Sequence, residues 1–196
     1  GTATTATNQS GGTVSATTGY FSSYIHTDGN TSIIRGDSPT LYFRDTNEMS
    51  AMIHNNGNQL YILRGGTDTQ TWTQVNGHWP WIFNLSNNDS TCGGSLYCVG
   101  DVPAYSDKRV KPDISKIKDP LNKVCSINGY TYKRTDTDDD KTHTGVLAQE
   151  VMEVLPEVVH GSEDTTYSVA YGNMVGLLIE AIKELKLEID ELKKSR

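Results

Sequence analysis

The feature that most constrains this fold is a repeat of apolar residues near the C-terminus, at alternating spacings of three and four. This spacing is typical of a coiled-coil helix, with β-branched residues at heptad position a and leucine at position d. It predicts a helix over residues 173–194. Because an isolated helix of this length is marginal in water, its apolar stripe must be covered. The repeat comprises Val175, Leu178, Ile182, Leu185, Ile189 and Leu192.

The cover for this stripe is either the chain's own domain or further copies of the chain. Burying all six side chains would contribute on the order of 10 kcal/mol per chain as an upper estimate. Glu188 at position g and Lys193 at the next e position are suited to an interchain salt bridge. We therefore expect self-association. The residue types at a and d alone favour two strands rather than three.

Composition changes abruptly near residue 105. Before this point there is no lysine, arginine occurs only at 35, 44 and 64, and every tryptophan and phenylalanine is found there. After it lie 14 of the 17 lysine and arginine residues. We expect two modules, residues 1–105 and residues 106–196.

The first module reads as all-β. Its first 25 residues are rich in Thr, Ser and Gly and cannot form a core alone. Short β-type runs separated by turn signals then follow. Alternation places Leu41 and Phe43, or Leu60 and Ile62, on one face. Such polar strands suit an interwound, β-prism-like fibre built from several copies. The expected strands are residues 31–36, 40–45, 50–55, 59–65, 71–77, 79–85 and 95–102.

The second module reads as α+β. Residues 129–134 and 143–148 resemble the two strands of a hairpin, with a polar connection between them. Residues 149–159 indicate a short helix stopped by Pro156, and residues 165–171 a further strand. The long C-terminal helix completes the module.

A series of motifs runs through this module in a fixed order. Ser-Asp-Lys-Arg-Val-Lys occupies residues 106–111, Gly-Val-Leu-Ala-Gln-Glu-Val occupies 145–151, and Leu-Pro-Glu-Val-Val follows at 155–159. A tyrosine, Tyr171, precedes the C-terminal helix. Together, over residues 105–194, they resemble the C-terminal intramolecular chaperone and auto-processing domain of phage tail fibres and tailspikes, endosialidases included. A related domain occurs in myelin regulatory factor.

The resemblance implies a domain that forms a trimer, guides the upstream β-structure into a trimeric fold and is then cut off by a serine–lysine dyad. It implies cleavage between Tyr105 and Ser106, with Ser106 as nucleophile and Lys111 as base. The residue types suit this chemistry, because a serine hydroxyl needs a neighbouring base. Lysine can act as one only when desolvation or nearby positive charge lowers its pKa from about 10.4. Lys108 and Arg109 are candidate sources of that charge.

The five-residue spacing between Ser106 and Lys111 leaves two alternatives open. Neither a regular strand nor a regular helix brings these side chains together. Either the segment bends, or the lysine comes from another chain. Two rival functions also stand: a catalytically silent structural cap of a fibre, and a self-cleaving regulator of the myelin regulatory factor kind. The fibre-like first module argues against the second.

Aromatic residues offer a candidate receptor contact. Trp79 and Trp81 share a face if the chain is extended, and they and Trp72 suit either glycan stacking or burial in a trimer interface. The resemblance implies a host cell-surface receptor, either a glycan or an outer-membrane protein. It also implies a virion tail fibre made in the bacterial cytoplasm.

Other features exclude functions. The net charge of −7 argues against sequence-independent binding of nucleic acid. No window approaches a membrane span, and no signal peptide is visible. We expect no cofactor or metal, because the His and Cys residues lack ligand spacing and residues 136–140 lack a calcium-loop pattern. We interpret the three cysteines as reduced thiols and the four Asn-x-Ser sequons as chance occurrences. The missing initiator Met suggests a fragment or a processed product.

Overall fold

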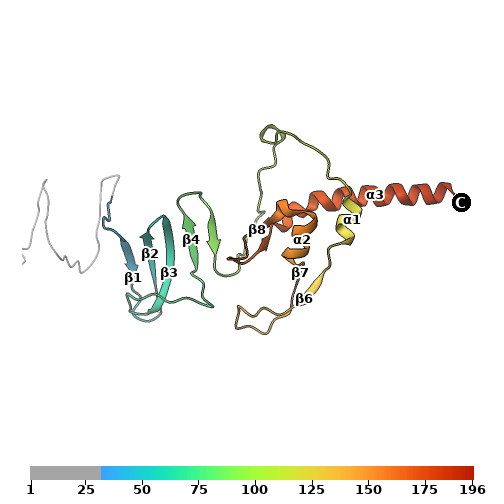
Figure 1. The fold of residues 1–196 in the computed structure, drawn as a ribbon. Helices are drawn as coiled ribbons and strands as arrows, with labels where there is room; N and C mark the ends of the chain where they lie inside the picture. The colour runs from blue at the N-terminus through green and yellow to red at the C-terminus, as the bar shows by residue number, and fades with distance from the viewer. Residues whose placement is uncertain (1–31) are drawn as a thin grey trace, which may run out of the picture. The chain divides into compact units, whose positions relative to one another are not determined.

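The computed structural model describes residues 32–196 (Figure 1). The Thr/Ser/Gly-rich start and the sequons at Asn8 and Asn30 lie outside the described residues. The chain divides into two compact units. Of the described residues, 32–73 and 79–93 form the first unit, and 74–78 and 94–196 form the second.

The first unit is one antiparallel sheet of five strands in sequential order. A two-residue turn, Gly57–Asn58, joins the second and third strands, and glycine accommodates the positive φ of 57° at its first position. The sheet confirms a β-rich first part. Its strands are β1 (Thr40–Phe43), β2 (Met49–Asn56), β3 (Gln59–Thr67), β4 (Trp81–Asn84) and β5 (Ser90–Cys92).

Three expected strands are absent from the described chain. Residues 32–36 and 95–102 form no ladder, and residues 71–77 contribute only isolated bridges, at Trp72 and Val75. The prediction was wrong there because β-type residues form a strand only where a neighbouring backbone accepts and donates hydrogen bonds. Conversely, β5 was not predicted, since it is short and polar.

The two faces of this sheet differ in burial. Ser50, Met52, His54 and Leu63 are buried on one face. On the other face, Leu41, Ile53, Ile62 and Trp81 are aligned across four strands. The first three of these are each at least 40% exposed. The single chain therefore leaves an apolar row uncovered.

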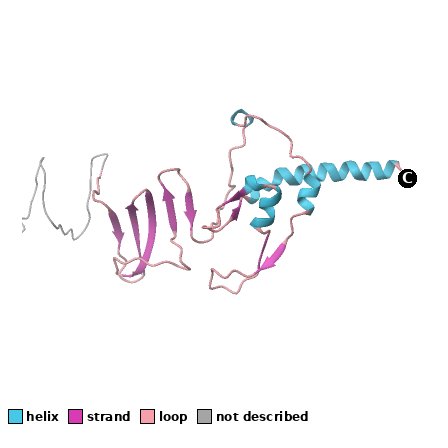
Figure 2. Ribbon diagram, in the orientation of Figure 1, coloured by secondary structure: helices cyan, strands magenta, loops and turns pink. Residues whose placement is uncertain are grey.

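The second unit mixes helices with two small hairpins (Figure 2). The predicted hairpin, the stop before Pro156 and the long helix are confirmed, whereas the strand expected over 165–171 shortens to two residues. A 3-10 turn leads directly into the long helix. The elements are η1 (Lys108–Val110), α1 (Pro120–Cys125), β6 (Tyr130–Tyr132), β7 (His143–Gly145), α2 (Ala148–Val154), η2 (Pro156–Val158), β8 (Val159–His160), β9 (Ser168–Val169), η3 (Tyr171–Met174) and α3 (Val175–Lys194).

The core of the second unit forms where the start of α3 meets α2 and η2. Val151, Leu155, Val158 and Leu177 are buried together. The short helix α1 packs on the next part of α3. There, the backbone N–H of Leu121 donates to Oε2 of Glu184 at 3.0 Å, which satisfies one of the unpaired donors at the start of α1. The N-terminal half of α3 is thus packed against its own domain.

Candidate functional site

The motif at residues 106–111 folds into one 3-10 turn, visible as an isolated coil on the long loop before α1 (Figure 2). Asp107 caps this turn, since its Oδ1 accepts from the backbone N–H of Arg109 at 2.8 Å. The backbone N–H of Lys111 then donates to the Lys108 carbonyl oxygen at 3.2 Å. Because the chain reverses direction over these residues, its two ends approach each other.

The turn brings together the two residues to which the family resemblance assigns chemistry. Nζ of Lys111 donates to Oγ of Ser106 at 2.7 Å. The bend, rather than a second chain, accounts for this approach. Tyr105, Ser106 and Lys111 are all exposed in the single chain.

Arg109 is engaged inside the turn. Its guanidinium donates to both carboxylate oxygens of Asp107, the shortest contact being 2.6 Å from Nη2 to Oδ2. This hydrogen bond, helped by the Arg109 backbone N–H, holds the pKa of Asp107 below its usual value. The same pair holds the pKa of Arg109 above its usual value. Since its charge is paired with Asp107, Arg109 is a weaker source of positive field at Lys111 than the sequence suggested.

The downstream motifs act as structural connections. Glu150 accepts from the Asn128 backbone N–H at 3.0 Å and from the Tyr130 hydroxyl at 2.5 Å. The Tyr130 hydrogen bond is the main cause of a lowered pKa at Glu150 and of a raised pKa at Tyr130. Glu150 thereby fixes the segment between α1 and β6. Sequence reasoning missed these partners, because they lie 20 and 22 residues away.

Gly145 and Tyr171 form a second connection. A Cβ on Gly145 would come within 2.6 Å of the Tyr171 hydroxyl oxygen. A side chain at this position would therefore require the hydroxyl to shift, and the hydroxyl accepts from the Val146 backbone N–H at 3.4 Å. The pair ties β7 to the turn that starts α3.

The heptad residues of α3 point away from the domain core. Leu177 and Ala181, on the adjoining face, are buried, whereas Val175, Leu178, Ile182, Leu185, Ile189 and Leu192 are all exposed. One residue along a helix corresponds to about 100° of rotation. We call the uncovered a/d stripe the seam. One face of α3 therefore packs on the domain, while the seam lies exposed on another face of the same helix.

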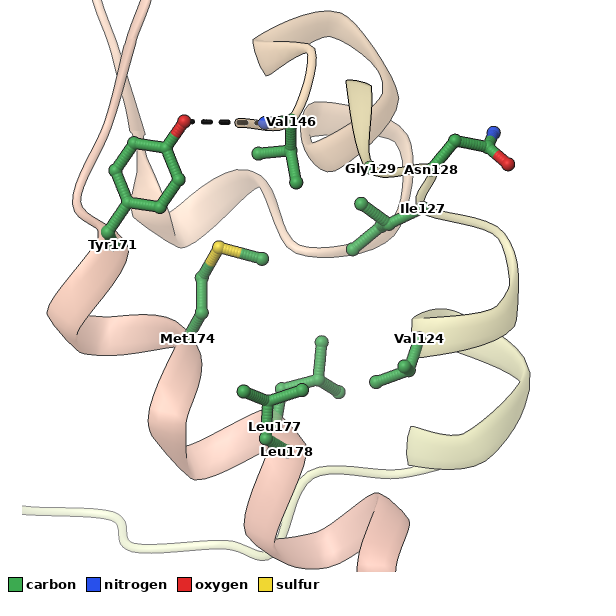
Figure 3. A pocket seen from close by; sticks show the side chains of 9 residues that line it. All are labelled: Val124, Ile127, Asn128, Gly129, Val146, Tyr171, Met174, Leu177 and Leu178. Atoms are coloured by element: carbon green, nitrogen blue, oxygen red, sulfur yellow. Dashed lines mark hydrogen bonds between the residues drawn. The ribbon is translucent and has the colours of Figure 1, made fainter. Parts of the chain in front are cut away.

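A pocket of about 290 Å³ opens between the seam and α1 (Figure 3). Met174, Leu177 and Leu178 line it from the helix side, and Val124 and Ile127 line it from the other side. Tyr171 and Val146 close one end, at their mutual hydrogen bond. The pocket is almost entirely apolar, so it suits an apolar side chain rather than a charged ligand.

The tryptophans do not form a single row. Trp72 lies beside the ring of His54, with centroids 4.9 Å apart. Together with Trp79 and Tyr61 it lines a pocket of about 140 Å³. Trp81 stacks on Phe83 at 5.9 Å, on the opposite face of the sheet according to the strand register.

Comparison with known families identifies the second unit. Residues 106–160 match the model of a family that is named as a peptidase and described as the chaperone of endosialidase. The match begins at Ser106, directly after the proposed scissile bond. The C-terminal part of this chain is a tail-fibre chaperone domain of that family. The match lies within the second unit, and the five-stranded sheet of the first unit precedes it in the sequence.

Relatives of known identity extend the similarity upstream of the chaperone domain. The long tail fibre protein Gp37 of Salmonella phage S16 is 33% identical over 175 residues, which cover 85% of this chain and 22% of that protein. The long tail fibre protein Gp37 of Enterobacteria phage Ox2 is 31% identical over 156 residues, covering 72% of this chain and 58% of that protein. The chain thus spans about a fifth of the first relative and somewhat more than half of the second.

Two further features were sought in residues 32–196. No group of three or more His, Cys, Asp or Glu side chains in this range is arranged to hold a metal ion. No helix within the described range is long and apolar enough to cross a bilayer. Cys92, Cys98 and Cys125 form no disulfide.

Proposed function

We propose that the chaperone domain joins three copies of the chain, guides the β-rich segment into a trimeric fibre end and then cuts itself off between Tyr105 and Ser106. The exposed seam of α3 supports assembly, and the exposed row on the sheet supports a β-segment completed by other copies. The number three follows the family resemblance rather than the residue types at a and d.

The approach of Ser106 Oγ to Lys111 Nζ, at 2.7 Å, is the observation that carries the cleavage proposal. In this reaction Oγ attacks the carbonyl carbon of Tyr105 through a five-membered ring, and Lys111 in its neutral form takes the hydroxyl proton. The C–N bond then breaks, the nitrogen receives the proton, and an ester links Tyr105 to the Ser106 side chain. Water hydrolyses the ester, which leaves a carboxylate on Tyr105 and a free amino group on Ser106.

Assembly is proposed to switch this chemistry on. In the single chain both groups are exposed to water. Neighbouring copies packed around the turn would exclude that water and bring further positive side chains near it. Cleavage would then follow correct assembly and report on it.

Denaturing gel electrophoresis of freshly expressed protein tests the proposal. A cutting domain yields two bands of about half the chain each, and a Ser106→Ala variant yields the single band of 21.5 kDa. A wild-type chain that never splits, yet assembles, would instead support a silent structural cap.

We further propose that the mature β-segment sits at a virion fibre end and contacts a host cell-surface receptor. The pocket at His54, Tyr61, Trp72 and Trp79 combines aromatic faces with polar groups, as glycan sites do. Trp81, on the apolar face, suits the interface between copies instead. Comparing host-cell binding of Trp79→Ala with that of wild type tests this: unchanged binding would remove the pocket from the receptor site.

A further inference from the structure

The pocket beside α3 has a place in the heptad pattern that points to its occupant. Continuing the heptad backwards from Val175 at position a puts Met174 at position g, and Leu178 is the first residue at d. Both line the pocket. The pocket is therefore located on the g flank of the seam, where the seam meets the domain (Figure 3).

In a parallel coiled coil, a residue at g lies against the residue five positions further on, at e of the neighbouring helix. For Met174 that residue is Ile179 of the next copy. Ile179 is 47% exposed in the single chain, although it is a large apolar side chain. The other residues at e, Lys186 and Lys193, are both charged.

Charge complementarity supports the same register further along the helix. Glu188 at g comes opposite Lys193 of the neighbour by the same five-residue offset. Lys186 is already engaged by Asp190 of its own chain. Both ends of the seam are thus consistent with a parallel second copy. Near the domain the g and e positions would form an apolar pair, and near the C-terminus they would form an ionic pair.

We infer that the pocket lined by Met174, Leu178, Ile127 and Val124 is the receiving site for Ile179 of a neighbouring copy. The side chain would be buried between the neighbour's helix start and its α1, so the contact would join helix pairing to domain packing. This inference rests on the proposed assembly, but it fixes one specific contact within it. Each copy would both donate an isoleucine and receive one.

Cysteine cross-linking of the full chain tests this contact. A Met174→Cys, Ile179→Cys double variant, carried on a Ser106→Ala chain whose native Cys92, Cys98 and Cys125 are replaced by serine, should form disulfides between copies under mild oxidation. The two positions are about 140° apart on one helix, so they cannot bridge within a chain. The expected result is a covalent oligomer on a non-reducing gel.

Two further variants serve as matched comparisons. The pair Met174→Cys, Lys183→Cys moves the second thiol to the outer face and should not cross-link above the single-cysteine backgrounds. The pair Glu188→Cys, Lys193→Cys should cross-link if the helices associate in parallel at all. If 188–193 links form but 174–179 links do not, the pocket has another occupant and the inference is overturned. If neither pair links and sedimentation finds single chains, the proposed assembly itself fails.

A truncation measures the contact without added thiols. Ile179→Ala should weaken association roughly tenfold or more per pocket, because it removes most of a buried apolar side chain. Leu187→Ala removes an equally large side chain from position f, where it is 65% exposed, and should leave association unchanged. Equal effects of the two truncations on the dissociation midpoint in sedimentation would contradict the inference.

Discussion

Nζ of Lys111 and Oγ of Ser106 lie 2.7 Å apart, across a turn that Asp107 caps. This geometry favours a dyad within one chain over a lysine donated by another. Mixed assemblies of Ser106→Ala chains and Lys111→Ala chains should therefore show no cleavage on a denaturing gel. Recovered cleavage in the mixture would contradict the arrangement within a chain and require donation between chains.

Cleavage should also depend on the seam. We expect Ile182→Asp to abolish both oligomer formation and cleavage, because Ile182 is 66% exposed in the single chain and the proposed assembly would bury the introduced charge at an a position. Light scattering and a denaturing gel measure the two effects. Leu187→Asp adds the same charge at a position on the outer face that is 65% exposed, and it serves as the control. A seam variant that stays monomeric yet still cleaves itself would show that cleavage does not require assembly.

The domain core should be sensitive where α3 docks. Leu177 is fully buried, so Leu177→Ala should lower the free energy of unfolding by about 2–5 kcal/mol. Leu187→Ala, on the exposed face, should change it by less than about 0.5 kcal/mol. Both truncations are carried on the Ser106→Ala chain and unfolded in urea at the same protein concentration. The two free energies of unfolding are then compared. Equal losses would mean that Leu177 is not in the core.

Gly145 and Tyr171 should behave as a coupled pair. Gly145→Ala places a methyl group 2.6 Å from the Tyr171 hydroxyl oxygen, and we expect a destabilisation of about 1 kcal/mol or more. Tyr171→Phe removes that oxygen, so the double variant should recover much of the loss. A double-mutant cycle by thermal unfolding measures the coupling; strictly additive effects would contradict the contact.

Glu150 provides a prediction about pH. Its pKa is lowered from 4.5, mainly by the Tyr130 hydroxyl, so its contribution is fully present above 4.5 and is lost as the pH falls through the lowered value. Tyr130→Phe should move the Glu150 titration back toward 4.5. Carboxyl NMR shifts followed from pH 6 to pH 2 measure both titrations. An unchanged Glu150 titration in the variant would rule out the tyrosine as the cause.

The sequence predicted elements whose signal is local. The spacing from Val175 to Leu192 needed no knowledge of the rest of the chain to indicate α3, and Pro156 was sufficient to end the preceding helix. Residues 95–102 were misassigned for the opposite reason: their β-type side chains are real, but a strand also needs a partner, and none lies within the described chain.

The sequence motifs indicated the residues of the candidate dyad but not their geometry. The separation of Ser106 and Lys111 argued against contact in regular structure. The signal for a bend was nevertheless present, because aspartate is a preferred capping residue and Asp107 directly precedes the turn. The pocket could not have been anticipated, because it depends on α1 lying against the g flank of α3, and this packing joins residues more than 40 positions apart.

The rotation between Leu177 and Leu178 has a kinetic consequence. Since one faces the chain's own core and the other faces outward, each subunit can finish folding its small domain before it meets another. In the proposed assembly, encounter between copies would then be a separate event of higher order, and its rate would rise steeply with the concentration of folded chains. The yield of assembled chains would accordingly depend on how much protein has accumulated, rather than on how fast each ribosome releases it.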